Sequence, residues 1–335
     1  MDTRLEELKN WITETMHGAE FTVTPLLGDA SFRRYFRIQF ADHTAIAMDA
    51  PPEREESYPF VTIARAFAKL GLRVPQILKE NLSIGFLLLT DLGDKLYLKE
   101  LNSNNADILY GNALQELLVV QACREVHGWA LPHFDQRMMG QELDFFSYWF
   151  LDRYLNLHLT QKESVTVREA FQFLLDAATE QPQVCVHRDY HSRNLLVLDD
   201  CKVGIVDFQD AVWGPLTYDV VSLLRDCYVD WPQEQVQKWA LTYLRNAIAA
   251  NIVPATITPE QFMRWFDLMG IQRHLKATFI FVRKLLRDNH PGYLDDVPRT
   301  LNYIHTVAKP YRELQKFNKL FNNVILPKFN EVYLQ

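Results

Sequence analysis

Short apolar runs dominate the beginning of the chain, and longer helical patterns dominate the rest. Apolar residues recur at steps of three and four over 5–16 and again over 60–70, which predicts two amphipathic helices. The other early runs are strand-sized, and turn-forming residues separate the first three, which favours antiparallel hairpins. The predicted strands lie at 21–27, 35–40, 44–48, 77–78 and 86–89. We therefore expect this part of the chain to form a small sheet with helices against it.

The pattern changes near 91–94, after which helical spacing is the rule. Three further runs predict strands, at 184–186, 195–198 and 202–207. Helices are expected at 107–128, 143–156, 166–180, 219–228, 234–250, 259–288 and from 297 onward. The sequence therefore predicts an α+β protein of two lobes, a small β-rich lobe over 1–92 and a larger, mostly helical lobe over 93–335.

Composition argues against several functional classes. The 335 residues carry 35 Lys and Arg against 42 Asp and Glu, so no strongly basic surface is expected to bind nucleic acid or an anionic membrane. The longest apolar runs are too short to span a membrane, and the first residues lack the pattern of a secretory signal. The 4 Cys lie far apart, without a zinc-binding or disulfide pattern. These features favour a cytoplasmic globular protein that acts on a small molecule, and they leave its oligomeric state open.

A polar loop between predicted strands holds the residues with the clearest chemical meaning. The loop at 187–194 reads His-Arg-Asp-Tyr-His-Ser-Arg-Asn, and the following pair of strands ends at Asp207. Phosphoryl transfer needs a carboxylate that orients the acceptor hydroxyl, and carboxylate or amide oxygens that hold magnesium. Asp189, Asn194 and Asp207 supply that set. Because the two strands are expected to form a hairpin, Asp207 should return to the loop that holds Asp189 and Asn194.

The spacing of these residues matches the catalytic and metal-binding loops of kinases. His191 distinguishes two kinds of kinase, because protein kinases usually have Lys two positions after the catalytic Asp. The loop resembles the His-x-Asp-x-His-x-x-Asn loop of the aminoglycoside phosphotransferase and choline kinase family. No long activation segment follows Asp207, which argues against control by phosphorylation of such a segment.

The resemblance implies a two-lobed, protein-kinase-like fold that uses ATP and Mg2+. It implies that Asp189 is catalytic, that Asn194 and Asp207 bind the metal, and that His191 contributes to the nucleotide site. Asp219 matches a family aspartate that braces the catalytic loop, although it fits equally well as the N-terminal cap of a helix.

The predicted phosphate-covering loop departs from the kinase pattern. Residues 27–35 occupy its place with one Gly instead of three. Backbone amides with Ser31, Phe32 and Arg33 are the candidate phosphate contacts, and a solvated hairpin turn is the alternative. At the lobe junction, Leu92 is the candidate hinge residue for the adenine.

Met48 is the second departure, because kinases carry at about this position a Lys that binds the nucleotide phosphates. Either Arg33, Arg34 or Arg54 replaces that Lys, or the nucleotide is bound weakly, or the protein is a pseudokinase. The intact set of Asp189, Asn194 and Asp207 favours an active enzyme.

Four segments together resemble one bacterial branch of the family, the anomeric kinases of N-acetylmuramate and N-acetylglucosamine used in cell-wall sugar recycling. These segments are 28–35, 48–52, 187–195 and 270–276. For such an enzyme, the resemblance implies transfer of the γ-phosphoryl group of ATP to the C1 hydroxyl of the sugar. The candidate substrate contacts are Arg193, Trp213, Arg273 and His274. Arg273, His274 and Lys276 are candidate partners of a muramate carboxylate, and a solvated helix face is the alternative.

Other functions remain open from the residues alone. The acceptor could be another small alcohol or an aminoglycoside, for which Glu142, Asp144 and Asp152 offer some acidic character. A nucleotide-binding scaffold is a second alternative. In a third, His187, Asp189 and His191 bind a metal in a hydrolase, although the remaining histidines form no cluster along the chain.

Overall fold

The computed structural model describes residues 2–26 and 32–334. By their contacts these residues fall into two compact units, each assembled from separate stretches of chain. The first comprises Met1–Glu100, Glu125–Leu131 and Arg193–Ala211, and the second Leu101–Arg124, Pro132–Ser192 and Val212–Gln335. The predicted lobes, 1–92 and 93–335, are two contiguous segments of the chain, and the boundary between them stays a prediction.

A five-stranded antiparallel sheet forms the first unit, in the order β1-β2-β3-β5-β4. Its strands are β1 (Thr22–Leu26), β2 (Arg34–Gln39), β3 (Thr44–Asp49), β4 (Ile77–Asn81) and β5 (Phe86–Thr90). The short apolar runs of the sequence thus formed the expected hairpins. Met48 on β3 is fully buried, with Tyr35 and Leu87 as its cross-strand neighbours.

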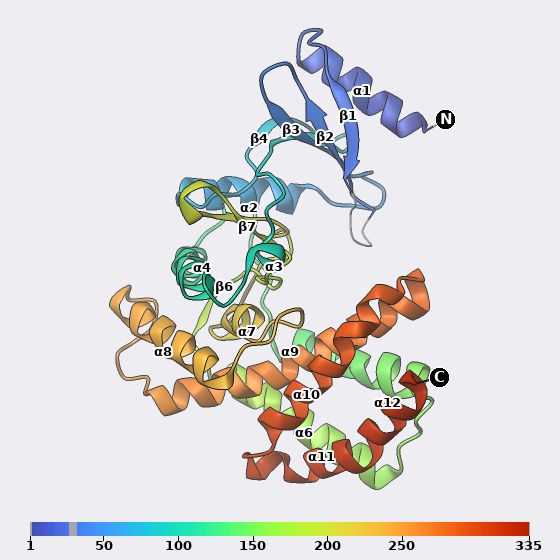
Figure 1. Ribbon diagram of the computed structural model, residues 1–335, viewed down its shortest axis with the longest axis vertical. Coiled ribbons are helices and arrows are strands. Elements are labelled where there is room, and N and C mark those ends of the chain that lie inside the picture. The colour runs from blue at the N-terminus through green and yellow to red at the C-terminus, as the bar shows by residue number, and fades with distance from the viewer. Residues whose placement is uncertain (1, 27–31, 335) are drawn as a thin grey trace. The chain divides into compact units, whose positions relative to one another are not determined.

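The amphipathic helix α1 (Thr3–Thr15) covers part of this sheet (Figure 1). Leu8 and Ile12, one turn apart, are fully buried against Phe36, Ile38 and other apolar residues of the strands. Because these contacts exclude water from one helix face, burial stabilises α1 on the sheet.

The hairpin of β7 (Leu195–Val197) and β8 (Val203–Ile205) belongs to the first unit although it lies late in the sequence. Backbone hydrogen bonds attach it there: the Ile205 N–H donates to the Arg73 carbonyl, and the Val197 N–H donates to the Lys95 carbonyl. Phe208 follows the hairpin and stacks on Phe60 of α2 (Tyr58–Lys69), with ring centroids 5.1 Å apart. Helix α3 (Tyr97–Glu100) completes the unit.

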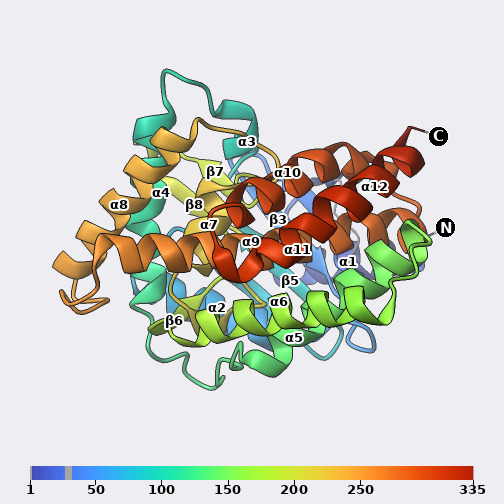
Figure 2. The same cartoon turned by 90° about the horizontal axis from the view of Figure 1, so that it is seen from below.

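Helices build most of the second unit. They are α4 (Ala106–Gln121), α5 (Gln136–Phe145), α6 (Gln161–Thr179), α7 (Tyr218–Leu224), α8 (Gln233–Ala249), α9 (Pro259–Asp288), α10 (Val297–Ala308), α11 (Gln315–Leu320) and α12 (Leu326–Tyr333). Helix α9 contacts α5, α6, α7, α8 and α10 and forms the centre of the unit (Figure 2). Its middle is buried on all sides, which a surface helix with one apolar face would not be.

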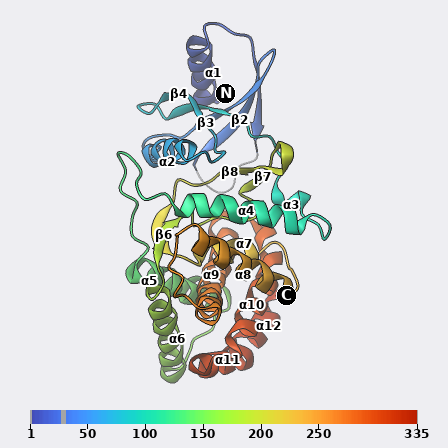
Figure 3. The same ribbon diagram turned by 90° about the vertical axis from the view of Figure 1, so that its left-hand side faces the viewer.

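Helices α4 and α8, whose ribbons are labelled in Figure 3, are in contact. Aromatic and polar side chains line this contact. Tyr110 lies against Trp239, with ring centroids 4.5 Å apart. The Tyr243 hydroxyl donates to the side chain of Gln121, whose Nε2 donates to the Leu216 carbonyl at 3.1 Å. Both polar groups are therefore satisfied in the interior.

One strand of the second unit was not predicted. β9 (Val212–Pro215) pairs with β6 (Gln183–Val186), and Cys185 lies opposite Trp213. Gly and Pro at the end of β9 are typical of a turn, so the sequence showed no sign of a strand. The strand forms because β6, which is distant in the sequence, provides its hydrogen-bonding partner. The predicted helix at 107–128 was too long, because α4 ends at Gln121. The helix expected over 143–156 is in fact the end of α5 followed by a π-helical stretch, Phe146–Tyr154.

Cys123, Cys185 and Cys227 are buried, whereas Cys201 is exposed on the turn between β7 and β8. Among the described residues, no helix is long and apolar enough to cross a membrane.

Candidate active site

The loop that follows β6 is fixed from inside the second unit. β6 is fully buried at its end, and His187 follows it directly. The backbone N–H groups of His187 and Arg188 donate to the two carboxylate oxygens of Asp219 on α7, at 2.6 and 3.0 Å. Arg188 has φ +76°, a left-handed conformation that non-glycine residues rarely adopt and that such anchoring can maintain.

Asp219 therefore braces the loop, as the family resemblance implied. The alternative role as a helix cap is wrong, because Thr217 holds the N-cap position of α7 and the Asp219 carboxylate bonds the loop backbone. Asp219 is fully buried, and this burial raises its pKa to about 7 against the opposing effect of the two N–H donors.

Asp189 lies among positive charges in the second unit. The Lys276 Nζ is 3.8 Å from Asp189 Oδ1, and the Asp189 side chain keeps 35% of its surface exposed. Burial by itself raises the pKa of Asp189, but the positive charges of Lys276, Arg188 and Arg273 outweigh it and hold the pKa below its usual value. The carboxylate is therefore ionised at neutral pH and partly accessible, as a group that accepts a proton must be.

His191 is neutral at physiological pH, because burial lowers its pKa below the usual value. Its ring meets Tyr228 edge-on, with centroids 5.5 Å apart, and its Nδ1 is buried with no hydrogen-bond partner. Its predicted role in nucleotide binding stays a prediction.

Asn194 and Asp207 come together in the first unit, as the predicted hairpin required. The Asn194 Nδ2 donates to Asp207 Oδ2 at 3.0 Å, and the Gln209 Nε2 donates to Asp207 Oδ1 at 2.9 Å. Asp207 has φ +65°. The residue after it, Phe208, is anchored by its buried ring, which lies against Phe60 and Phe67. A rare backbone conformation is thus maintained by packing.

The side chains of Asn194 and Asp207 fit a magnesium ion. A carboxylate and an amide lie within hydrogen-bond distance of each other, and oxygen atoms of these two kinds are ligands of Mg2+. The amide of Asn194 would present its oxygen to the ion in place of the Nδ2 that now bonds Asp207.

Two of the predicted phosphate contacts converge on a carboxylate of the first unit. The Phe32 N–H donates to Glu55 Oε1 at 3.1 Å, and Arg33 Nη2 lies 3.2 Å from Glu55 Oε2. The pair shows that this backbone amide and guanidinium can hold an anionic group. Ser31, the third predicted contact, lies outside the described residues.

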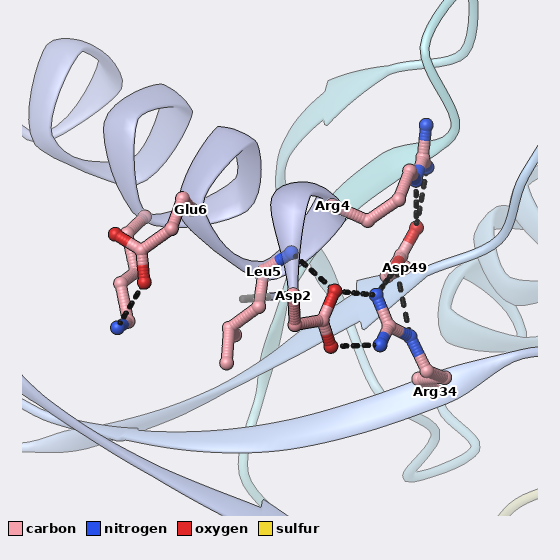
Figure 4. A network of polar contacts seen from close by, with 7 residues as sticks. Asp2, Arg4, Leu5, Glu6, Arg34 and Asp49 are labelled. Atoms are coloured by element: carbon pink, nitrogen blue, oxygen red, sulfur yellow. Dashed lines mark hydrogen bonds and ion pairs between the residues drawn. The ribbon is translucent and has the colours of Figure 1, made fainter.

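Arg34 was a candidate for binding the nucleotide phosphates, but it forms ion pairs with carboxylates of the first unit. It donates to Asp49 through Nε at 3.0 Å and Nη2 at 2.6 Å, and it also pairs with Asp2 (Figure 4). Arg4 of α1 binds the other oxygen of Asp49, whose side chain is fully buried. Arg34 therefore joins α1 to the sheet, and it is no substitute for the Lys that Met48 replaces. Arg54 lies over the Phe32 ring, 4.7 Å from its centroid.

Leu92 is half-buried in the segment that follows β5, and its predicted hinge role stays a prediction. Its neighbour Asp91 is structural, because its carboxylate accepts hydrogen bonds from Arg37 at 2.7 Å and from the Gly93 N–H at 2.8 Å.

The three basic residues considered in the middle of α9 are buried, which contradicts the alternative of a solvated helix face. Arg273 is 5% exposed, His274 0% and Lys276 7%. Arg273 Nη1 lies 3.6 Å from the Cys227 sulfur, and burial lowers the pKa of His274 to about 3, so His274 is uncharged at neutral pH. Of the three candidate cations, only Arg273 and Lys276 carry charge.

Sequence reasoning gave Glu142 no structural role, although it is a buried partner of these cations. Arg188 Nη2 donates to Glu142 Oε1 at 2.8 Å, and Gln272 Nε2 donates to Oε2 at 3.0 Å. Lys276 Nζ is 3.8 Å from Glu142 Oε1. In the sequence Glu142 stands in a helical stretch that also carries Arg137, Gln141 and Asp144, so nothing there marks it as buried.

The two other candidate substrate residues are half-buried. Trp213 lies on β9 with the guanidinium of Arg124 over its ring, 5.6 Å from the centroid. Arg193 begins the stretch Arg193–Ala211 of the first unit. Both roles stay predictions.

Neutral His274 makes the fold sensitive to acid. Its Nε2 donates to the Arg225 carbonyl at 3.0 Å, and its ring stacks on Tyr303. Its folded pKa of about 3 lies below the usual 6.5, so its contribution to stability is present above pH 6.5 and is lost as the pH falls toward 3. We expect His274→Gln to flatten the pH dependence of the unfolding free energy in this window by about 1.4 kcal/mol per pH unit.

Urea unfolding at a series of pH values measures this slope. His158→Gln is the control, because the His158 side chain is 77% exposed, and its slope should equal that of the wild type. Equal slopes for His274→Gln and the wild type would contradict the assignment.

The hydrolase alternative lacks a geometric basis in the described part of the chain. No group of three or more His, Cys, Asp or Glu side chains there is arranged to hold a metal ion. Nδ1 of the fully buried His187 instead accepts the N–H of Asp189 at 3.3 Å.

Comparison with known proteins gives one consistent result. The sequence profile of the phosphotransferase enzyme family matches residues 22–256, well over half of the chain. An N-acetylmuramate/N-acetylglucosamine kinase from Pseudomonas putida is 41% identical over 329 residues, which cover 95% of this chain and 96% of that protein. The kinase of the same name from Pseudomonas aeruginosa is 43% identical over 296 residues, covering 88% and 86%.

The fold is also that of known phosphotransferases. The ADP-bound crystal structure of aminoglycoside phosphotransferase APH(2'')-Ib superposes with a TM-score of 0.58 at 14% identity, over 90% of this chain and 98% of that one. The similarity extends over both units and confirms the predicted kinase-like fold.

Proposed function

Because the chain belongs to the phosphotransferase enzyme family, we propose that it is an ATP-dependent sugar kinase. It transfers the γ-phosphoryl group to the anomeric C1 hydroxyl of N-acetylmuramate, N-acetylglucosamine or both, as a step of cell-wall sugar recycling. The family is the one expected from the catalytic loop. The two relatives that carry the kinase name match nearly the whole chain, which supports this acceptor class.

The observation that carries the proposal is the ionised, partly accessible Asp189 within a cluster of cations. Asp189 accepts a hydrogen bond from the acceptor hydroxyl and takes its proton. The hydroxyl oxygen then forms a bond to the γ-phosphorus, the bond between that phosphorus and the β–γ bridging oxygen breaks, and ADP leaves with the bonding electrons.

Phosphate binding is divided between charged groups of the chain and the metal. Mg2+ neutralises phosphate charge when bound, and Asn194 and Asp207 are the residues that would hold it. Phe32 and Arg33 supply an amide and a guanidinium for phosphate oxygens, in competition with Glu55.

An aminoglycoside acceptor is less well supported. A polycationic substrate requires free acidic side chains, whereas Glu142 is already bound by Arg188 and Gln272. The similarity to an aminoglycoside phosphotransferase lies in the fold, at 14% identity.

A coupled ATP-consumption screen tests the acceptor. We expect turnover with N-acetylmuramate or N-acetylglucosamine, and none with plain hexoses, choline or aminoglycosides. The methyl glycoside of N-acetylglucosamine is the matched control, because it lacks a free C1 hydroxyl and should not consume ATP. Phosphorus NMR then locates the phosphate, and a product phosphorylated on C6 would contradict the anomeric assignment.

We expect Asp207→Asn to weaken Mg-ATP binding by at least about tenfold, because it replaces a charged oxygen ligand with a neutral amide. Titration calorimetry with Mg-ATP measures this loss. Asp199→Asn, an exposed change on the same hairpin, should bind as the wild type does. Unchanged affinity in Asp207→Asn would remove Asp207 from the metal site.

A further inference from the structure

The catalytic loop has no charged group at the position where protein kinases carry a Lys. His191 stands two residues after Asp189, and its lowered pKa leaves it neutral at physiological pH. A neutral ring cannot hold a carboxylate in the ionised state as an ammonium does. Another residue must therefore supply the positive charge that performs this task for Asp189.

Lys276 on α9 reaches Asp189 from a distant part of the chain. Its Nζ is 3.8 Å from Asp189 Oδ1 and 3.8 Å from Glu142 Oε1, and it donates to the Tyr218 hydroxyl at 2.9 Å. Only 9% of the Lys276 side chain is exposed. The ammonium thus has three oxygens around it, from the loop after β6, from α5 and from α7, and two of them belong to carboxylates.

The other cations near Asp189 have partners elsewhere. Arg188 forms its ion pair with Glu142, and Arg273 approaches the Cys227 sulfur. The cations whose charges act on Asp189 at neutral pH are Lys276, Arg188 and Arg273, and the buried Asp219 opposes ionisation. Lys276 has the largest effect of these cations.

We propose that Lys276 is a positioning residue for the catalytic base, an ammonium that keeps the Asp189 carboxylate ionised and oriented toward the acceptor hydroxyl. The inference rests on the proposed function, in which Asp189 is that base. Lys276 is then not a contact of the muramate carboxylate, the role considered for it above, because its ammonium already faces two carboxylates of the chain itself.

The charge is tested by two variants at the same position. Lys276→Gln removes the charge and keeps a donor for the Tyr218 hydroxyl, whereas Lys276→Arg keeps the charge. With protein carrying 13C at the Asp carboxyl carbons, and with the Asp189 signal assigned from its loss in Asp189→Asn, the pKa is read directly. We expect a rise of about 1–3 pH units in Lys276→Gln and a value near the wild type in Lys276→Arg.

Enzyme kinetics give the second measurement. A higher pKa of the base moves the acid limb of kcat/KM to higher pH, because the base must be deprotonated to act. We expect this shift in Lys276→Gln for N-acetylmuramate and N-acetylglucosamine alike, with a lower kcat and a KM within about twofold of the wild type.

Lys284 provides a matched control on the same helix. Its Nζ donates to the Tyr293 hydroxyl at 3.0 Å, as Lys276 does to Tyr218. Lys284→Gln should leave the Asp189 titration and the pH profile unchanged. Should Lys276→Gln fail to fold, Tyr218→Phe gives a second test. This variant keeps the ammonium of Lys276 but removes the hydroxyl to which it donates. We expect kcat to fall while the pKa of Asp189 stays lowered.

Three outcomes would overturn the inference. Asp189 could titrate in Lys276→Gln as in the wild type, kcat could be unchanged in Tyr218→Phe, or Lys276→Gln could raise KM for N-acetylmuramate alone. The last result would make Lys276 a contact of the substrate carboxylate. If the wild type phosphorylates no sugar, the proposed function fails, whereas the carbon titration still measures the action of Lys276 on Asp189.

Discussion

Asp189→Asn is expected to lower kcat for sugar phosphorylation by about 10²- to 10⁴-fold, the usual contribution of a general base. Asparagine has the same shape, but it cannot take the proton of the acceptor hydroxyl. It also removes the negative charge that Lys276 faces at 3.8 Å. Initial rates at saturating ATP and sugar measure the loss.

Nucleotide binding separates this effect from a damaged fold. Asp189→Asn should bind Mg-ATP nearly as the wild type does, since Asn194 and Asp207 are untouched. Asp144→Asn, an exposed change on α5, should retain full activity. Full sugar-kinase activity in Asp189→Asn would show that Asp189 is not the base.

Asp219→Ala should produce the largest loss of stability. It leaves the buried N–H group of His187 and the half-buried N–H group of Arg188 without acceptors, at a cost of about 1–3 kcal/mol for the first and less for the second. The loop that carries Asp189 loses its anchor at the same time, so activity should fall with stability. Urea unfolding measures the first effect.

The pH dependence of this loss is a specific signature of Asp219. The folded pKa of about 7 lies above the ordinary 3.8, so the contribution of Asp219 to stability is full below pH 3.8 and declines as the pH rises through 7. The difference between the wild type and Asp219→Ala should therefore be larger at pH 5 than at pH 8. Asp144→Ala should change stability by less than about 0.5 kcal/mol, and an equal effect from the two variants would contradict the bracing role.

The local parts of the candidate site could be predicted from the sequence. Asn194 and Asp207 are joined by one hairpin, so the spacing of two short strands was enough to bring them together. The same holds for the hairpins of β1, β2 and β3, which follow from short runs and the turns between them. The pairing of β3 with β5 was not predicted, because α2 and β4 lie between these strands in the sequence.

The contacts between distant segments could not be predicted in this way. Glu142 meets Arg188 across 46 positions, and Arg4 meets Asp49 across 45, through helix packing that periodicity alone does not determine. Arg34 illustrates the consequence. In the sequence it is one more cation beside a candidate phosphate loop, and only the fold shows that Asp2 and Asp49 neutralise it.

The hairpin between Asn194 and Asp207 also offers a place for a spectroscopic probe. Cys201 is exposed on its turn, whereas Cys123, Cys185 and Cys227 are buried. A maleimide dye should therefore attach at one position without any cysteine being removed, since alkylation follows the accessibility of the thiol. The dye would lie at the turn, at the opposite end of the hairpin from Asn194 and Asp207, and would therefore label this hairpin without occupying its metal-binding residues.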